Sequence, residues 1–137
     1  MPEGPVSGRE GHERGTRSVR LDRRRADLAT VQRAAARIEA LNATLDERIA
    51  AAPQPEERLR LLRDATNQIT RAANDAIQAY RRVADALGEA MAADRGEQAE
   101  ARQMRSVLHE ARADMLRALE ITSRRYPWAA PWPPEEP

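Results

Sequence analysis

The chain contains no cysteine, no lysine and no phenylalanine, and aromatic residues make up only 3% of its 137 residues. Without cysteine it has neither a disulfide framework nor a thiolate nucleophile, and the absence of thiols does not distinguish one compartment from another. Because apolar residues reach 41% with so few aromatics among them, the chain is expected to build one small domain with a thin core.

Long apolar runs are also missing from the sequence. No stretch approaches the roughly 18 residues that a transmembrane helix needs, and the first residues lack the apolar segment of a signal peptide. We therefore predict a protein with no membrane partner, located in the cytoplasm or in a particle that assembles there.

Charge is abundant but balanced, with 23 basic and 22 acidic residues and a net charge of +1. The whole molecule therefore lacks a strong field that would steer it toward phosphate. All the basic residues are arginine, which has two interpretations. Arginine suits bidentate contacts with phosphate or carboxylate groups, whereas a GC-rich genome produces the same bias without selection for binding.

Glycine and proline are concentrated near the two ends. Residues 1–17 hold four of the six glycines and almost no apolar side chains, which predicts a flexible arm. Residues 126–137 hold five of the nine prolines, which predicts an extended, polyproline-like tail. Residues 18–125 are left as the predicted helical domain.

Within residues 18–125, apolar side chains recur with the spacing of helices that bury one face. The first predicted helix spans 18–52, with Ser18 as its N-cap, and Pro53 and Pro55 end it. The second spans 55–93 and begins with proline followed by two glutamates, which suits a helix start. From Leu59 to Thr122 the apolar positions form one line along a helix face, which we call the seam, and this seam repeats every seven residues without losing phase.

The seam is broken only around Asp94, Gly96 and Glu97, and this break leaves two alternatives. Asp94 as N-cap with Glu97 three residues later resembles a capping box, which favours a turn and a third helix over 97–125. The seven-residue spacing keeps the same phase on both sides of the break, which favours one continuous helix from about 55 to 125. We predict the turn, and hence an all-α, antiparallel three-helix bundle or coiled coil.

Alanine fills many seam positions, and because it buries little area the monomeric bundle is expected to be only marginally stable. Self-association or a partner helix is therefore expected. Asn42 lies at a seam position, where a buried amide either fixes the register of the helices or faces a wet gap. The residues predicted to carry packing or oligomer contacts are Leu28, Ile38, Asn42, Leu45, Leu87, Leu108 and Met115. Other apolar residues lie off the strict seam and either complete the core or contact a partner: Leu41, Leu61, Ile77, Met91, Val107, Leu116, Leu119 and Ile121.

A cluster of arginines at the start of the first helix is the candidate phosphate-binding site. No aromatic residue is interleaved for base stacking, and charge runs at helix starts are usually solvated or paired with the carboxylates of a partner. The residues are Arg17, Arg20, Arg23, Arg24 and Arg25.

Three of the four aromatic residues lie in the tail rather than in the predicted core. A tryptophan pair flanked by prolines is pre-ordered and suits docking into a groove on a partner protein. The same segment has two alternatives, folding back over the end of the bundle or remaining inert. The predicted partner-binding residues are Tyr126, Trp128, Pro131, Trp132 and Pro133.

The sequence carries no pattern typical of catalysis or metal binding. His109 lacks a glutamate at the helical spacing that metal sites use, and no phosphate loop or nucleophile elbow is present. We therefore predict a non-enzymatic structural or adaptor subunit with no cofactor and no small-molecule ligand. Its expected partners are proteins or further copies of itself, and a nucleic-acid-associated protein is the alternative.

Overall fold

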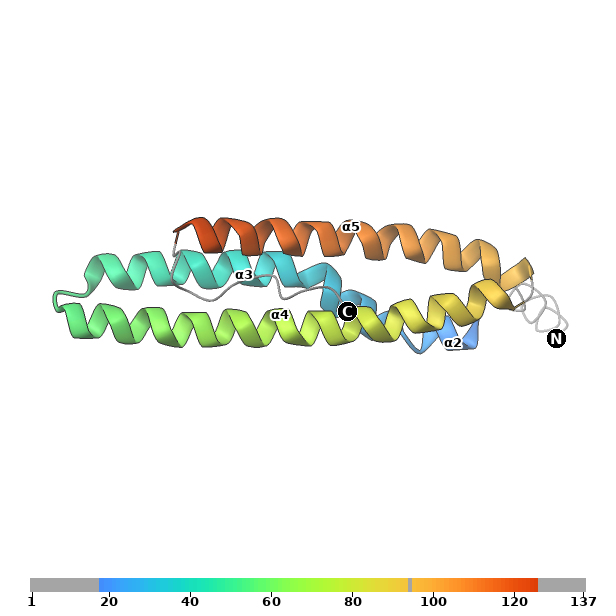
Figure 1. The fold of residues 1–137 in the computed structure, drawn as a ribbon, viewed down its shortest axis with the longest axis horizontal. Helices are drawn as coiled ribbons and strands as arrows, with labels where there is room; N and C mark the ends of the chain where they lie inside the picture. Colours follow the sequence, from blue (N-terminus) through green and yellow to red (C-terminus); the bar gives the residue numbers. More distant parts are fainter. Residues whose placement is uncertain (1–17, 94, 126–137) are drawn as a thin grey trace, which may run out of the picture.

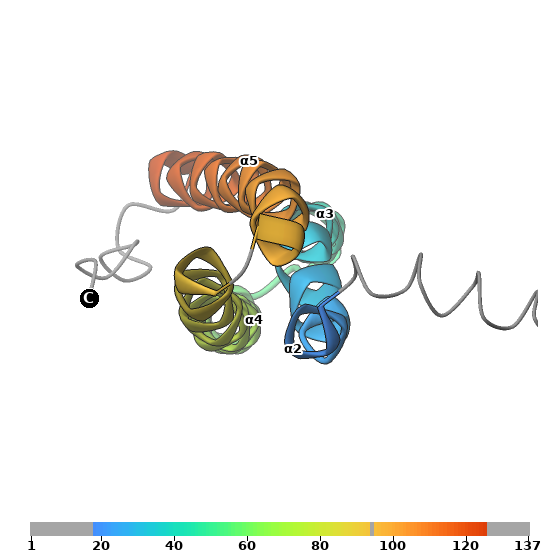
Figure 2. The ribbon, with the colours of Figure 1, turned by 90° about the vertical axis from the view of Figure 1, so that its right-hand side faces the viewer.

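The computed structural model describes residues 18–93 and 95–125, which form one short helix and three long ones. These are α2 (Val19–Asp22), α3 (Arg25–Ala51), α4 (Pro55–Ala92) and α5 (Arg95–Arg125). The long helices lie side by side in an elongated rod (Figure 1) and form a triangle when viewed from one end (Figure 2). The predicted flexible arm (1–17), the extended tail (126–137) and the cap at Asp94 lie outside the described residues.

The chain reverses after each long helix, so α3 and α5 run in one direction and α4 runs in the other (Figure 1). The guanidinium of Arg112 on α5 lies 5.5 Å from the ring centroid of Tyr80 on α4, which shows that these two helices lie against each other. The prediction of an antiparallel three-helix bundle is confirmed. The alternative of one continuous helix from about 55 to 125 is wrong, because α4 ends at Ala92 and α5 returns beside it.

The first predicted helix differs from the expectation, because Arg23 and Arg24 interrupt it. The backbone of Arg24 adopts φ −99° and ψ 3°, outside the usual helical region. Its N–H donates to the carbonyl of Leu21, three residues back, at 2.9 Å. The short helix α2 is nevertheless capped by Ser18 as predicted, since the hydroxyl oxygen accepts from the N–H of Leu21 at 3.3 Å.

Tertiary contacts explain the interruption of the first helix. The N–H of Ser18 donates to Oε1 of Glu100 at 2.8 Å, and the Ser18 hydroxyl also donates to Glu97. Leu21 is fully buried and Leu28 almost so. The bend at Arg23 and Arg24 thus lets α2 bury its leucine while Ser18 meets the first turns of α5.

The connection between α3 and α4 is short and closed by one side chain. Nε of Arg58 donates to the carbonyl of Ala52 at 2.9 Å, which provides a partner for a carbonyl that the helix leaves free. Pro55 opens α4, with Glu56 and Glu57 in its first turn, as the sequence predicts.

The core is thin and rich in alanine, as the composition predicts. The largest fully buried side chains are Leu21, Val31, Ile38, Val83, Leu108, Met115 and Leu119. The helix α4 faces them mainly with alanine, including a second row at seven-residue spacing that the predicted seam omitted: Ala65, Ala72, Ala79 and Ala86. Small side chains along α4 therefore set the close approach of its neighbours.

Most of the apolar residues off the seam complete this core. Leu119 is fully buried, and five others are partly buried against the core clusters: Leu41, Ile77, Met91, Val107 and Leu116. Ile121 differs, since 49% of its surface is exposed. Leu59, predicted as a seam residue, is 50% exposed. It lies near the start of α4, the part of this helix that extends past the end of α5 (Figure 1).

Candidate functional site

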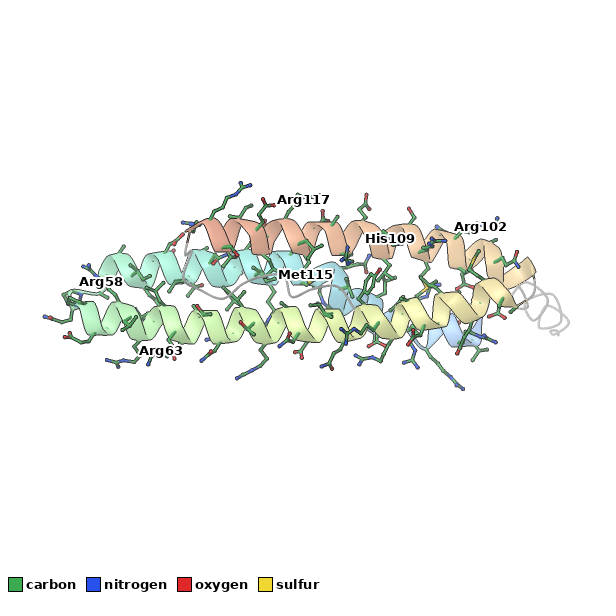
Figure 3. The ribbon with its side chains drawn as sticks, in the orientation of Figure 1. Arg58, Arg63, Arg102, His109, Met115 and Arg117 are labelled. Atoms are coloured by element: carbon green, nitrogen blue, oxygen red, sulfur yellow. The ribbon has the colours of Figure 1, made fainter. Side chains whose placement is uncertain are left out.

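The residues predicted for packing or oligomer contacts all lie inside the bundle of a single chain. Each is at most 6% exposed, namely Leu28, Ile38, Asn42, Leu45, Leu87, Leu108 and Met115. Met115 lies between the helices, whereas Arg117 on the same helix points away from them (Figure 3). These side chains are therefore buried in the core of a single chain.

Asn42 and Thr122 are polar residues buried in this core. Nδ2 of Asn42 donates to the hydroxyl of Thr122 at 2.7 Å, and the Thr122 hydroxyl donates to the carbonyl of Ala118 at 2.9 Å. Oδ1 of Asn42 is buried without a hydrogen-bond partner. Because a misaligned register would leave the whole amide buried without partners, this contact favours the observed alignment of α3 with α5.

The arginine cluster is largely paired with carboxylates of its own chain. Nη2 of Arg25 lies 2.7 Å from Oε2 of Glu100 on α5. Nε of Arg20 lies 3.4 Å from Oε2 of Glu97, also on α5. Arg24 contacts Asp27 at 3.4 Å. Among the described residues Arg23 has no ion-pair partner, and Arg17 lies outside them. The cluster thus fastens α2 and the start of α3 to α5, a role that the sequence pattern alone did not reveal.

Asp27 is the centre of a small ion-pair network between α3 and α4. Nη2 of Arg82 donates to its Oδ1 at 3.0 Å and Nε at 3.2 Å. The hydrogen bonds and charge of Arg82, helped by Arg24, lower the pKa of the Asp27 carboxyl below its ordinary value despite partial burial. The same contact raises the pKa of Arg82. Asp27 thus holds two arginines in fixed positions.

A surface hollow lies beside this network, and its lining mixes the two signs of charge. Four arginines contribute to it, together with Asp85, Ala86 and Glu89; the arginines are Arg20, Arg23, Arg24 and Arg82. Asp27 and Glu97, which lie outside the lining, form ion pairs with three of these arginines. The hollow is therefore not a free basic surface of the kind that tracks a phosphate backbone.

An apolar surface is left open at the opposite end of the rod. The last residue of α5, Arg125, pairs with Asp46 on α3, and α3 and α4 continue past this point to their connection (Figure 1). Ile49 and Leu62 are half-buried there. Arg58 marks this end in Figure 3. We call the surface formed by Ile49, Leu59 and Leu62 the open end.

The predicted partner-binding residues lie outside the described residues: Tyr126, Trp128, Pro131, Trp132 and Pro133. Arg125, the residue that precedes this segment, ends α5 next to the open end. That α5 ends short of the α3–α4 connection, next to an uncovered apolar surface, was not apparent from the sequence. The observation that three aromatics follow the last helix was the available signal.

The described residues also hold few groups suited to chemistry. His109 is exposed on α5, and residues 18–93 and 95–125 contain no group of three or more His, Cys, Asp or Glu able to hold a metal ion. In the same ranges, no helix combines the length and apolar character that crossing a membrane requires.

Comparison of the chain with protein-family models, with curated proteins and with solved structures gave no match.

Proposed function

We propose that the protein is a non-enzymatic structural or adaptor subunit that joins a larger protein assembly and docks a partner through its tryptophan-bearing C-terminal segment. The observation that carries the proposal is the distribution of apolar groups. Most of the large apolar side chains of α3, α4 and α5 are buried within one chain, whereas both tryptophans follow the last helix in the sequence. Aromatic side chains outside a core are the groups most enriched at protein interfaces.

The shape of the bundle supports the same proposal. A rod of three helices holds its two ends apart (Figure 1), and ion pairs with α5 fasten α2 at one end. Such a scaffold holds Arg125, the residue to which the C-terminal docking segment is joined, at a defined position. Because most of the large seam side chains are buried within one chain, association with further copies would use other surfaces or the part of the seam near Leu59 that is left exposed.

Partner capture by the immobilised full-length chain tests this function. Trp128→Ala combined with Trp132→Ala is expected to abolish capture of a specific protein while the far-UV circular dichroism stays unchanged. Trp128→Phe combined with Trp132→Phe is the matched control, since it keeps apolar rings at both positions and should retain much of the capture. Equal capture by the alanine variant would contradict the proposal.

The competing function is a nucleic-acid-associated protein that uses the arginine cluster. Phosphate contacts release counterions, so such binding should weaken steeply between about 50 and 200 mM salt. It should also disappear on nuclease treatment or when Arg17, Arg20, Arg23, Arg24 and Arg25 are changed to Gln. The pairing of three of these arginines with carboxylates favours the adaptor.

A further inference from the structure

The third long helix stops short of the end of the hairpin that it covers. Arg125 ends α5 opposite Asp46, while α3 continues to Ala51 and α4 begins at Pro55. At 1.5 Å per residue, the five residues of α3 beyond Asp46 extend for about 8 Å. Along this length two helices lie side by side without the third (Figure 1).

The uncovered length continues the same apolar seam that α5 covers elsewhere. Ile49 lies seven residues after Asn42, which bonds to Thr122 of α5. Leu62 lies seven residues before Ile69, which is buried in one cluster with Met115 and Leu119 of α5. A spacing of seven returns a side chain to nearly the same face of a helix, so both residues point toward the space beyond the end of α5.

Burial along the seam falls at the position where α5 ends. Ile69 is 3% exposed, Leu62 is half-buried and Leu59 is 50% exposed. Leaving such side chains in water forgoes hydrophobic stabilisation that a covering segment would supply. The open end is thus an unfilled part of the core rather than an ordinary polar surface.

We propose that residues 126–137 of the same chain cover the open end, with Trp128 and Trp132 packed on Ile49, Leu59 and Leu62. An extended chain spans about 3.3 Å per residue. Trp128, three residues after Arg125, reaches about 10 Å, and Trp132 reaches about 23 Å. The open end lies within this range of both side chains.

Connection to the last helix favours this occupant over a separate molecule. Because the segment is joined to Arg125, which ends α5 beside the surface, its effective concentration there is in the millimolar range typical of short linkers. Its prolines also reduce the conformational entropy that docking removes. The inference rests on the docking role proposed above for the same tryptophans, and adds that a partner must displace them from the open end.

Tryptophan fluorescence of the full-length chain tests the inference directly, because Trp128 and Trp132 are the two tryptophans of the sequence. In the wild type, the emission should be blue-shifted and protected from acrylamide relative to a synthetic peptide of residues 126–137. Leu59→Asp should return both properties to those of the peptide, and Leu59→Gln should do the same without adding a charge. Far-UV circular dichroism verifies that both variants remain folded.

Val19→Asp is the matched control, since Val19 is 67% exposed and lies at the other end of the rod (Figure 1). It should leave the emission unchanged. Emission that matches the peptide in the wild type, or that ignores both Leu59 substitutions, would overturn the inference. A blue shift that disappears on dilution would also overturn it and would assign the segment to a second copy.

This experiment distinguishes failure of the inference from failure of the proposed function. The fluorescence is measured on the isolated chain, so it reports docking at the open end with no partner present. If the tryptophans are solvated in the isolated chain but still required for partner capture, the inference is wrong and the adaptor function stands. If they are protected in the isolated chain yet dispensable for capture, the packing of the tryptophans on the open end stands, and the proposed docking of a partner through them is wrong.

Discussion

The side-chain amide of Asn42 on α3 donates to the hydroxyl of Thr122 on α5 at 2.7 Å, inside a core built mainly from apolar residues. Thr122→Val removes the acceptor and leaves the amide buried without a partner, which should lower the free energy of unfolding by about 1–3 kcal/mol. Denaturant unfolding of the purified chain measures this change.

Replacing both partners provides the control for that measurement. Asn42→Leu together with Thr122→Val removes the buried polar groups altogether, including the unpartnered Oδ1 of Asn42. The double variant should be about as stable as the wild type or more so. If instead it loses more than the single variant, packing at this position outweighs the hydrogen bond.

The alanines of α4 are expected to be required by close helix packing rather than to mark an underfilled core. Ala76 is fully buried between α3 and α5, so Ala76→Leu should destabilise the protein by about 1–3 kcal/mol. Ala40→Leu, at an exposed position of α3, should change stability by no more than about 0.5 kcal/mol. Thermal unfolding compares the two, and a stabilised Ala76 variant would show that the core has unfilled space.

Gly88 is a position where α4 can be improved. It lies on an exposed part of the helix, and an added Cβ would meet no atom within 4 Å. Gly88→Ala should therefore raise the free energy of unfolding by about 0.5–1 kcal/mol through the lower entropy of the unfolded chain. The reverse change at an exposed site of α3, Ala36→Gly, should lower it by a similar amount. No gain at Gly88 would mean that the glycine has another role.

The Asp27 network predicts a specific dependence of stability on pH. Its contact with Arg82 lowers the pKa of Asp27 in the folded state, whereas the unfolded value is about 3.9. The contribution to stability is therefore fully present above about pH 4 and is lost as the pH falls through the lower folded value. The difference in unfolding free energy between the wild type and Asp27→Asn should shrink over this range. A constant difference from neutral to acid pH would contradict the prediction.

The number of long helices and most of their bounds follow from local sequence signals. Pro53 and Pro55 end one helix and start the next because proline lacks an N–H and suits only the first turn. The seven-residue spacing of apolar side chains identified most of the core in the same way. Such signals depend on a few neighbouring residues, so they can be detected without knowing the rest of the fold.

The ion pairs and the interruption of the first helix did not follow from the sequence. Arg20 and Arg25 meet glutamates more than 70 positions away, and nothing in a run of arginines distinguishes a paired cluster from a free one. The row of alanines from Ala65 to Ala86 was likewise missed, because alanine is common on exposed and buried faces of helices alike.

What the sequence determined by itself is the all-α bundle, since helix propensity, proline placement and apolar periodicity all act locally along the chain. Only the tertiary structure decided where the surfaces lie. It buried the predicted oligomer seam within one chain and neutralised much of the arginine cluster. It also ended α5 short of the hairpin, so that Leu59 is left exposed. These outcomes depend on the lengths and relative positions of three helices, which interact only once the chain has folded back on itself.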